Sequence, residues 1–85
     1  MAGRKTVLIV EDDNNLRGMF SRALALDGFR VREARGGFEA LRVLDNDPPD
    51  IVILDLAMPG VDGFTVRNEL AAHPHTPHIP IVVLT

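Results

Sequence analysis

Three short aliphatic runs without charged side chains constrain the fold more than any other feature of the chain. They are TVLIV at residues 6–10, IVIL at 51–54 and IPIVVL at 79–84. Runs this short and this rich in β-branched residues are typical of strands buried on both faces of a sheet. A fourth segment, FRVREA at 29–34, alternates apolar and polar residues and predicts a strand at the edge of the sheet.

The segments between these runs carry apolar residues at helical spacing, which predicts three helices. The helices are expected over residues 14–27, 36–46 and 62–72. Asn14 or Asn15 is the expected N-cap of the first helix, and Gly28 is its expected left-handed C-cap. The apolar side chains that set the spacing, and that we expect to be buried, are Leu16, Met19, Phe20, Ala23 and Leu24 in the first helix, Phe38, Leu41 and Leu44 in the second, and Phe64, Val66, Leu70 and Ala71 in the third.

Strands that alternate with helices in this way predict a parallel sheet with helices on both of its faces. The crossovers between the strands should all be right-handed. Because only the strand at 29–34 is amphipathic, it belongs at an edge, and the strand at 6–10 lies inside the sheet. The order 2-1-3-4 satisfies this, so the expected fold class is α/β, a flavodoxin-like doubly wound parallel sheet. No repeat or linker interrupts the pattern, which indicates a single domain over residues 1–85.

Acidic residues follow two of the predicted buried strands. Glu11, Asp12 and Asp13 follow the first run, and Asp55 follows the second. In a sheet of this order, ligands bind beyond the carboxyl ends of the strands where the strand order reverses, here between the first and third strands. We therefore expect these side chains to share one cleft. The fourth strand delivers Thr85 to the same edge of the sheet.

Several carboxylates in one cleft need a compensating charge. At about 4 Å and an effective dielectric constant near 20, two carboxylates repel each other by roughly 4 kcal/mol. A divalent cation would let them all stay ionised, and a few hard oxygen ligands with open positions suit Mg²⁺. Asp55 would then face solvent as a nucleophile able to form an aspartyl phosphate. The alternative is that Glu11 and Asp12 only cap or turn the chain into the next helix, as Asp13 is expected to do.

The motifs VLIVEDD, DLAMPGVDG and IPIVVLT, in this order and spacing, resemble the receiver domain of two-component response regulators. GGFEAL in the second helix fits the same pattern, and the resemblance covers essentially the whole chain. It implies a CheY-like fold and a domain that takes a phosphoryl group from a sensor histidine kinase or phosphotransfer protein. It also implies the relay of a conformational signal rather than enzymatic turnover.

The resemblance implies a role for each matching residue. Asp55 matches the phosphoacceptor, Asp12 matches a direct ligand of Mg²⁺, and Glu11 matches its acidic companion, which can act through water. Mn²⁺ is an alternative ion. Ala57 would offer its backbone carbonyl to the metal, and Thr85 matches the hydroxyl residue that binds the phosphoryl group and moves on switching. The matches in the loop after the acceptor are Met58, Pro59 and Gly63.

The matching pattern ends at Thr85, before the fifth strand, the last two helices and the phosphoryl-binding lysine of the family. Lys5, the only lysine, lies at the opposite end of the first strand. We therefore expect the chain to be the N-terminal part of a receiver domain. The strand at 79–84 would then be an open sheet edge, where a homodimer or a domain swap can form. A phosphorylation-impaired interaction fragment is the alternative function.

A phosphohydrolase with an aspartate nucleophile and Mg²⁺ is a further alternative. Such enzymes, which resemble the dehalogenase superfamily, place an acid/base aspartate two residues after the nucleophile. Ala57 occupies that position here, which argues against turnover.

Composition excludes several other classes of function. The net charge is −3, cysteine is absent, and no apolar run approaches the ~18 residues of a membrane span. We therefore expect a cytoplasmic protein whose partners are neither membranes nor nucleic acids. HPHTPH at 73–78 is expected to be a surface loop. A scattered, solvated surface is expected for Arg17, Arg22, Arg30, Arg32, Arg35 and Arg42.

Overall fold

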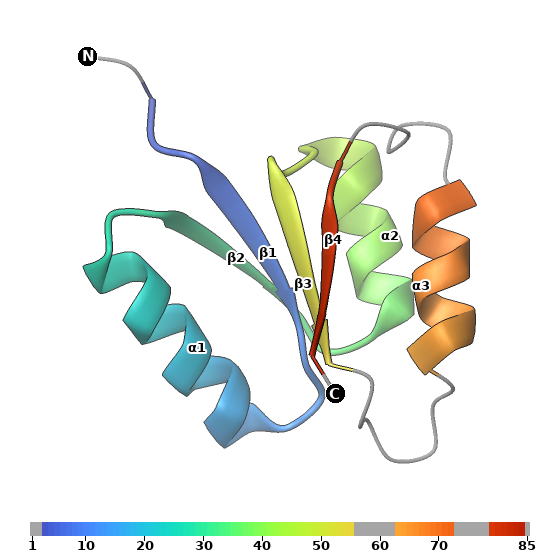
Figure 1. Cartoon of the computed structure of the whole chain (residues 1–85), viewed down its shortest axis with the longest axis horizontal. Helices are drawn as coiled ribbons and strands as arrows, with labels where there is room; N and C mark the ends of the chain where they lie inside the picture. Colours follow the sequence, from blue (N-terminus) through green and yellow to red (C-terminus); the bar gives the residue numbers. More distant parts are fainter. Residues whose placement is uncertain (1–2, 56–62, 73–78, 85) are drawn as a thin grey trace.

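The three aliphatic runs and the amphipathic segment all form strands. The computed structural model describes residues 3–55, 63–72 and 79–84. The strands within these ranges are β1 (Thr6–Val10), β2 (Arg30–Ala34), β3 (Ile51–Asp55) and β4 (Ile81–Leu84). They pair in parallel in the order β2-β1-β3-β4, which confirms the predicted fold class (Figure 1).

The register of the strands aligns their carboxyl ends. Val10 of β1 pairs with Leu54 of β3. The residue that follows each of these two in the sequence is acidic. Glu11 and Asp55 therefore lie at the same level of the sheet. Asp55 also pairs with Leu84 of β4. The parallel topology therefore brings acids that are distant in the sequence to one edge.

Helices cover both faces of the sheet, as expected for alternating strands and helices. They are α1 (Asn14–Leu26), α2 (Gly37–Asn46) and α3 (Gly63–Ala72). α1 packs against β1 and β2 on one face, whereas α2 and α3 lie side by side on the opposite face (Figure 1). None of the helices in the described ranges has the length and apolarity needed to cross a membrane.

The two ends of α1 differ in how well they match the prediction. Its N-cap is Asp13, which confirms the expectation that Asp13 caps or turns the chain into the helix, and is not Asn14 or Asn15. The Asp13 carboxylate accepts the N–H of Leu16 at 2.8 Å. A carboxylate also interacts favourably with the positive end of the helix dipole, which an asparagine amide does less well. At the other end, Gly28 has a φ of +98°, the predicted left-handed conformation.

The main hydrophobic core lies between the sheet and the layer formed by α2 and α3. Its buried members are Leu8, Val10, Ala34, Ala40, Leu44, Val52, Leu54 and Leu70. The predicted burial of Leu44 and Leu70 is therefore confirmed. Leu41 is partly buried and packs against this core.

In α2 and α3, two residues predicted to be buried lie outside the core. Phe38 is 78% exposed, because it lies about half a turn from the face that α2 buries. Ala71 is exposed, one position beyond the buried Leu70. The side chains of Phe64 and Val66 lie outside the described part of the molecule, so their predicted burial stays a prediction.

The face that α1 buries is also shifted from the predicted one. The exposed positions of the predicted face are Leu16, at 40%, Met19, at 55%, and Ala23. Along this helix, all of it described, Arg17 is the one buried residue, while Phe20 and Leu24 are half-buried. The prediction that Arg17 belongs to a solvated surface is therefore wrong. The helix is turned so that Arg17, rather than Met19, faces the sheet.

Candidate functional site

Glu11 lies at the centre of the predicted acidic site. It follows β1 directly, and its N–H donates to the Ala34 carbonyl of β2 at 3.0 Å. Its carboxylate is buried, and Oε2 accepts the N–H of Asp13 at 3.0 Å. The buried Oε1 has no hydrogen-bond donor among the described residues. A buried carboxylate oxygen without a donor is costly, so a positive group is expected beside it.

The pKa of Glu11 shows which other acids lie next to it. This pKa is raised from 4.5 to about 7. Burial is the largest cause, followed by the nearby carboxyl group of Asp55; Asp12 adds to the rise, whereas the Asp13 N–H opposes it. The acids of Asp55 and Asp12 thus lie beside the Glu11 carboxyl group and add to the cost of ionising it. Glu11, Asp12 and Asp55 meet at the carboxyl edge of the sheet, and we call them the acidic cluster.

The acidic cluster fits the chemistry of a magnesium site. Asp12 is exposed and Asp55 is half-buried, so both can offer carboxylate oxygens to an ion. A carboxyl group whose pKa is raised first by burial and then by neighbouring acids marks a place short of positive charge, which a divalent cation would supply. Side chains alone do not complete such a site: within the described ranges, no three His, Cys, Asp or Glu residues are placed to hold a metal ion.

The other predicted site residues fall largely outside the described ranges. Those outside are Ala57, Met58, Pro59 and Thr85, together with the histidine-rich segment 73–78. Leu84, which precedes Thr85 in the sequence, pairs with Asp55 in the β3–β4 register. Gly63 is the first residue of α3. The roles expected for these residues remain predictions.

Sequence reasoning missed Arg17, whose side chain contacts the backbone of the acidic cluster. Its Nη1 donates to the Glu11 carbonyl at 3.0 Å, and its Nη2 donates to Asn14 Oδ1 at 2.5 Å. Its Nε donates to Glu33 Oε1 of β2 at 3.4 Å, and Glu33 Oε2 accepts the Ser21 hydroxyl at 2.5 Å. Its position near the N-terminal end of the helix, where a cation opposes the dipole, points to a paired acid but does not reveal that the side chain is buried.

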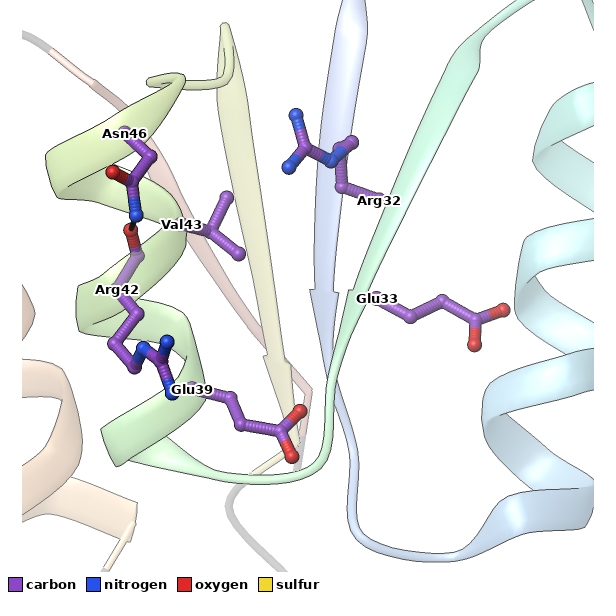
Figure 2. Close-up of a pocket in the computed structure, with 6 residues that line it drawn as sticks. All are labelled: Arg32, Glu33, Glu39, Arg42, Val43 and Asn46. Carbon is purple, nitrogen blue, oxygen red and sulfur yellow. Dashed lines mark hydrogen bonds between the residues drawn. The ribbon is translucent and has the colours of Figure 1, made fainter.

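An open pocket of about 240 Å³ lies between β2 and α2, apart from the acidic cluster (Figure 2). It is lined by Arg32, Glu33, Glu39, Arg42, Val43 and Asn46. Arg32 forms an ion pair with Asp47, and Glu39 Oε2 accepts the N–H of Arg35 at 3.1 Å. Glu33 turns away from the pocket toward α1 (Figure 2). Several of its charged groups are thus already engaged by the protein itself.

The sequence model of the response regulator receiver domain matches residues 7–85 of the chain. A curated relative, a probable cyclic di-GMP phosphodiesterase of Vibrio cholerae, is 41% identical over 80 residues. That match covers 94% of this chain but 18% of the relative. The chain therefore spans about a fifth of the length of that protein, whose activity as a whole cannot be transferred to it.

Solved structures of receiver domains are similar to the described fold. One is the N-terminal domain of a response regulator receiver protein from Methanoculleus marisnigri JR1, with a TM-score of 0.88 and 34% identity over 95% of this chain and 66% of that one. Another is the receiver domain of the sensor histidine kinase PA1611 from Pseudomonas aeruginosa PAO1, with a TM-score of 0.85 and 28% identity over 99% of this chain and 68% of that one. The second structure has a magnesium ion coordinated in its active site cleft.

Proposed function

Because the chain belongs to the response regulator receiver family, we propose that it is a signalling phosphoacceptor in which Asp55 takes a phosphoryl group. The donor would be the phosphohistidine of a sensor histidine kinase or a phosphotransfer protein. Receiver domains are signalling modules rather than classical enzymes. The observation that carries the proposal is the acidic cluster, in which Asp55 ends β3 beside Glu11 and Asp12.

The proposed transfer needs an accessible carboxylate and a way to limit charge repulsion. An oxygen of the Asp55 carboxylate forms the new bond to phosphorus while the phosphorus–nitrogen bond breaks, and the imidazole nitrogen keeps the electron pair and takes up a proton. When bound, Mg²⁺, or Mn²⁺ as an alternative, would supply positive charge to the phosphoryl oxygens. We assign its protein ligands to Asp12, Asp55 and the Ala57 carbonyl, with Glu11 as their acidic companion.

The remaining residues of the proposed site prepare Asp55 and read out its state. The Asp13 N–H holds the Glu11 carboxylate in place at 3.0 Å, so Glu11 stays beside Asp55. We propose that Thr85 hydrogen-bonds the phosphoryl group and moves with it, and that Met58, Pro59 and Gly63 shape the loop after the acceptor. Support comes from the register that sets Leu84, the residue before Thr85, against Asp55.

The proposed function involves no enzymatic turnover, and it also implies a cellular location and a class of partners. Ala57 stands where a phosphohydrolase would need its acid/base aspartate, so the aspartyl phosphate would be a signalling state. We also propose that the chain acts in the cytoplasm and contacts kinases or phosphotransfer proteins rather than membranes or nucleic acids. Its net charge of −3 supports the last point.

An intact-mass measurement tests the proposal. The chain is incubated with Mg²⁺ and a small acyl phosphate, beside an Asp55→Asn variant and an Asp27→Asn control, since Asp27 is an exposed acid at the far end of α1. We expect a phosphoryl adduct in the wild type and in the control but not in Asp55→Asn. A folded wild-type sample without an adduct would favour the alternative, an interaction fragment impaired in phosphorylation.

A further inference from the structure

Arg17 is a buried cation held from three sides. Its guanidinium donates to the Glu11 carbonyl in the loop after β1, to Asn14 at the start of α1 and to Glu33 on β2. A buried guanidinium is unfavourable unless its donors are satisfied, and here three of its nitrogen atoms have acceptors. The rigid fork of arginine matches this three-way arrangement, which an ammonium group could not reproduce.

The partner of Arg17 is itself restrained. Glu33 uses Oε1 for Arg17 and Oε2 for the hydroxyl of Ser21, one turn further along α1. The carboxylate therefore ties β2 to α1 at two points. Because both points lie on the same helix, Glu33 limits rotation of the Arg17 side chain as well as its distance from β2.

Hydrogen bonds of the protein fix the backbone from Glu11 to Asp13 at successive groups. The Glu11 N–H donates to Ala34, the Glu11 carbonyl accepts from Arg17, and the Asp13 N–H donates to the Glu11 carboxylate. Asp12 lies between these anchors, and its side chain is next to the Glu11 carboxyl group. The direction of the Asp12 side chain therefore depends on the backbone that Arg17 holds.

We propose that Arg17 is a positioning residue for the acidic cluster. By holding the Glu11 carbonyl, it sets where Asp12 presents its carboxylate, and so how well Asp12 and Asp55 can share a divalent cation. The inference rests on the proposed function, because it assumes that the cluster binds Mg²⁺. It adds a residue that acts through the backbone and touches neither the ion nor the phosphoryl group.

Charge and position predict opposite effects of removing Arg17. A guanidinium beside a Mg²⁺ site repels the ion, so the loss of its charge alone should tighten Mg²⁺ binding. The loss of its hold on the loop should weaken binding, and residues that support metal ligands typically change metal affinity by about 10- to 100-fold. The sign of the change in Mg²⁺ affinity therefore separates the two roles.

The test measures Mg²⁺ dissociation constants by titration calorimetry on folded protein. Arg17→Gln is compared with Arg22→Gln, which removes the same charge from an exposed position of the same helix. We expect Arg17→Gln to weaken Mg²⁺ binding by about tenfold, Arg17→Lys to recover only part of the loss, and Arg22→Gln to bind within about twofold of wild type. Unchanged or tighter binding by Arg17→Gln would overturn the proposal.

A second pair of variants keeps the test decisive if Arg17→Gln does not fold. Glu33 is exposed, and its replacements by Ala and by Gln remove the same charge, but only Gln keeps an oxygen that can accept from Arg17. We expect Glu33→Ala to bind Mg²⁺ about two- to threefold more weakly than Glu33→Gln, and equal affinities would contradict the inference.

The outcomes for this inference and for the proposed function are separable. Mg²⁺ binding by the wild type, lost in Arg17→Gln, would support the role of Arg17 even if no phosphoryl adduct formed. A wild-type chain that binds no Mg²⁺ would overturn the inference directly. The amide resonance of Asp13, which reports its hydrogen bond to Glu11, gives a readout without metal and should shift in Arg17→Gln but not in Arg22→Gln.

Discussion

Glu11 links the stability of the folded chain to pH, because its carboxyl group is buried beside two other acids. Below pH 4.5 it is protonated in both the folded and the unfolded chain. Between pH 4.5 and about 7, the unfolded chain releases this proton while the folded chain keeps it, so the free energy of unfolding falls as pH rises. Above pH 7 the loss is complete and on the order of 3 kcal/mol.

Urea unfolding in the presence of a chelator, between pH 4.5 and 8, measures this loss. The Glu11→Gln variant has no proton to release, so its free energy of unfolding should decline less over the same range and exceed that of the wild type at pH 8. Glu69→Gln, at an exposed position on α3, should follow the wild type. Parallel pH profiles for the wild type and Glu11→Gln would show that Glu11 does not carry the effect.

The placement of the acids could be predicted from the sequence, but the burial of Arg17 could not. Glu11 and Asp55 end strands that are visible as aliphatic runs, and the strand order alone puts those ends side by side. Arg17 depends on Glu33, which reaches it only after β2 has paired with β1. The spacing of apolar residues within α1 contains no information about that strand pairing. The prediction therefore placed Met19, rather than Arg17, on the buried face.

The helices and strands could be predicted from local sequence patterns, and two glycines show this for α1. One lies inside the helix and the other just after it, and they have opposite roles. Gly18 lies within the helix, where a Cβ would meet only Arg22 Nη1, at 4.0 Å. Gly28 follows the helix with a φ of +98°, where no heavy atom lies within 4 Å of an added Cβ. At both positions, adding a side chain therefore changes stability only through the backbone conformation and not through a steric clash.

Alanine at these two glycines should change stability in opposite directions. Gly18→Ala should stabilise the chain by about 0.5–1 kcal/mol, because alanine restricts the unfolded chain and favours the helix. Gly28→Ala should destabilise it by about 1–2 kcal/mol, because L-residues are strained in the left-handed region. Thermal unfolding of both variants beside the wild type gives the two signs, and a stabilising Gly28→Ala would contradict the assigned cap.

At the scale of the whole molecule, β4 is one of the two edge strands of the described sheet, with β2 at the other edge. Within the described ranges, it pairs with β3 alone, and Val82 is 42% exposed. An unpaired aliphatic edge can add a strand from a second chain, so we predict that the 85-residue chain self-associates there. Sedimentation should show a dimer whose population falls in Val82→Lys, and a monomer at every concentration would refute the prediction.

The two faces of the sheet differ in how much charge their packing includes. α2 and α3 close a core of buried aliphatic side chains, whereas α1 covers the buried Val7 and Ile9 of β1 with half-buried apolar residues and with one buried residue, Arg17, joined to β2 through Glu33. Ion pairs with a partly exposed member weaken as ionic strength rises, and aliphatic packing does not. Hydrogen exchange should therefore find two cooperative units, with the amides of α1 opening first and opening more easily in salt. The loop that carries Asp12 belongs to the unit that loosens.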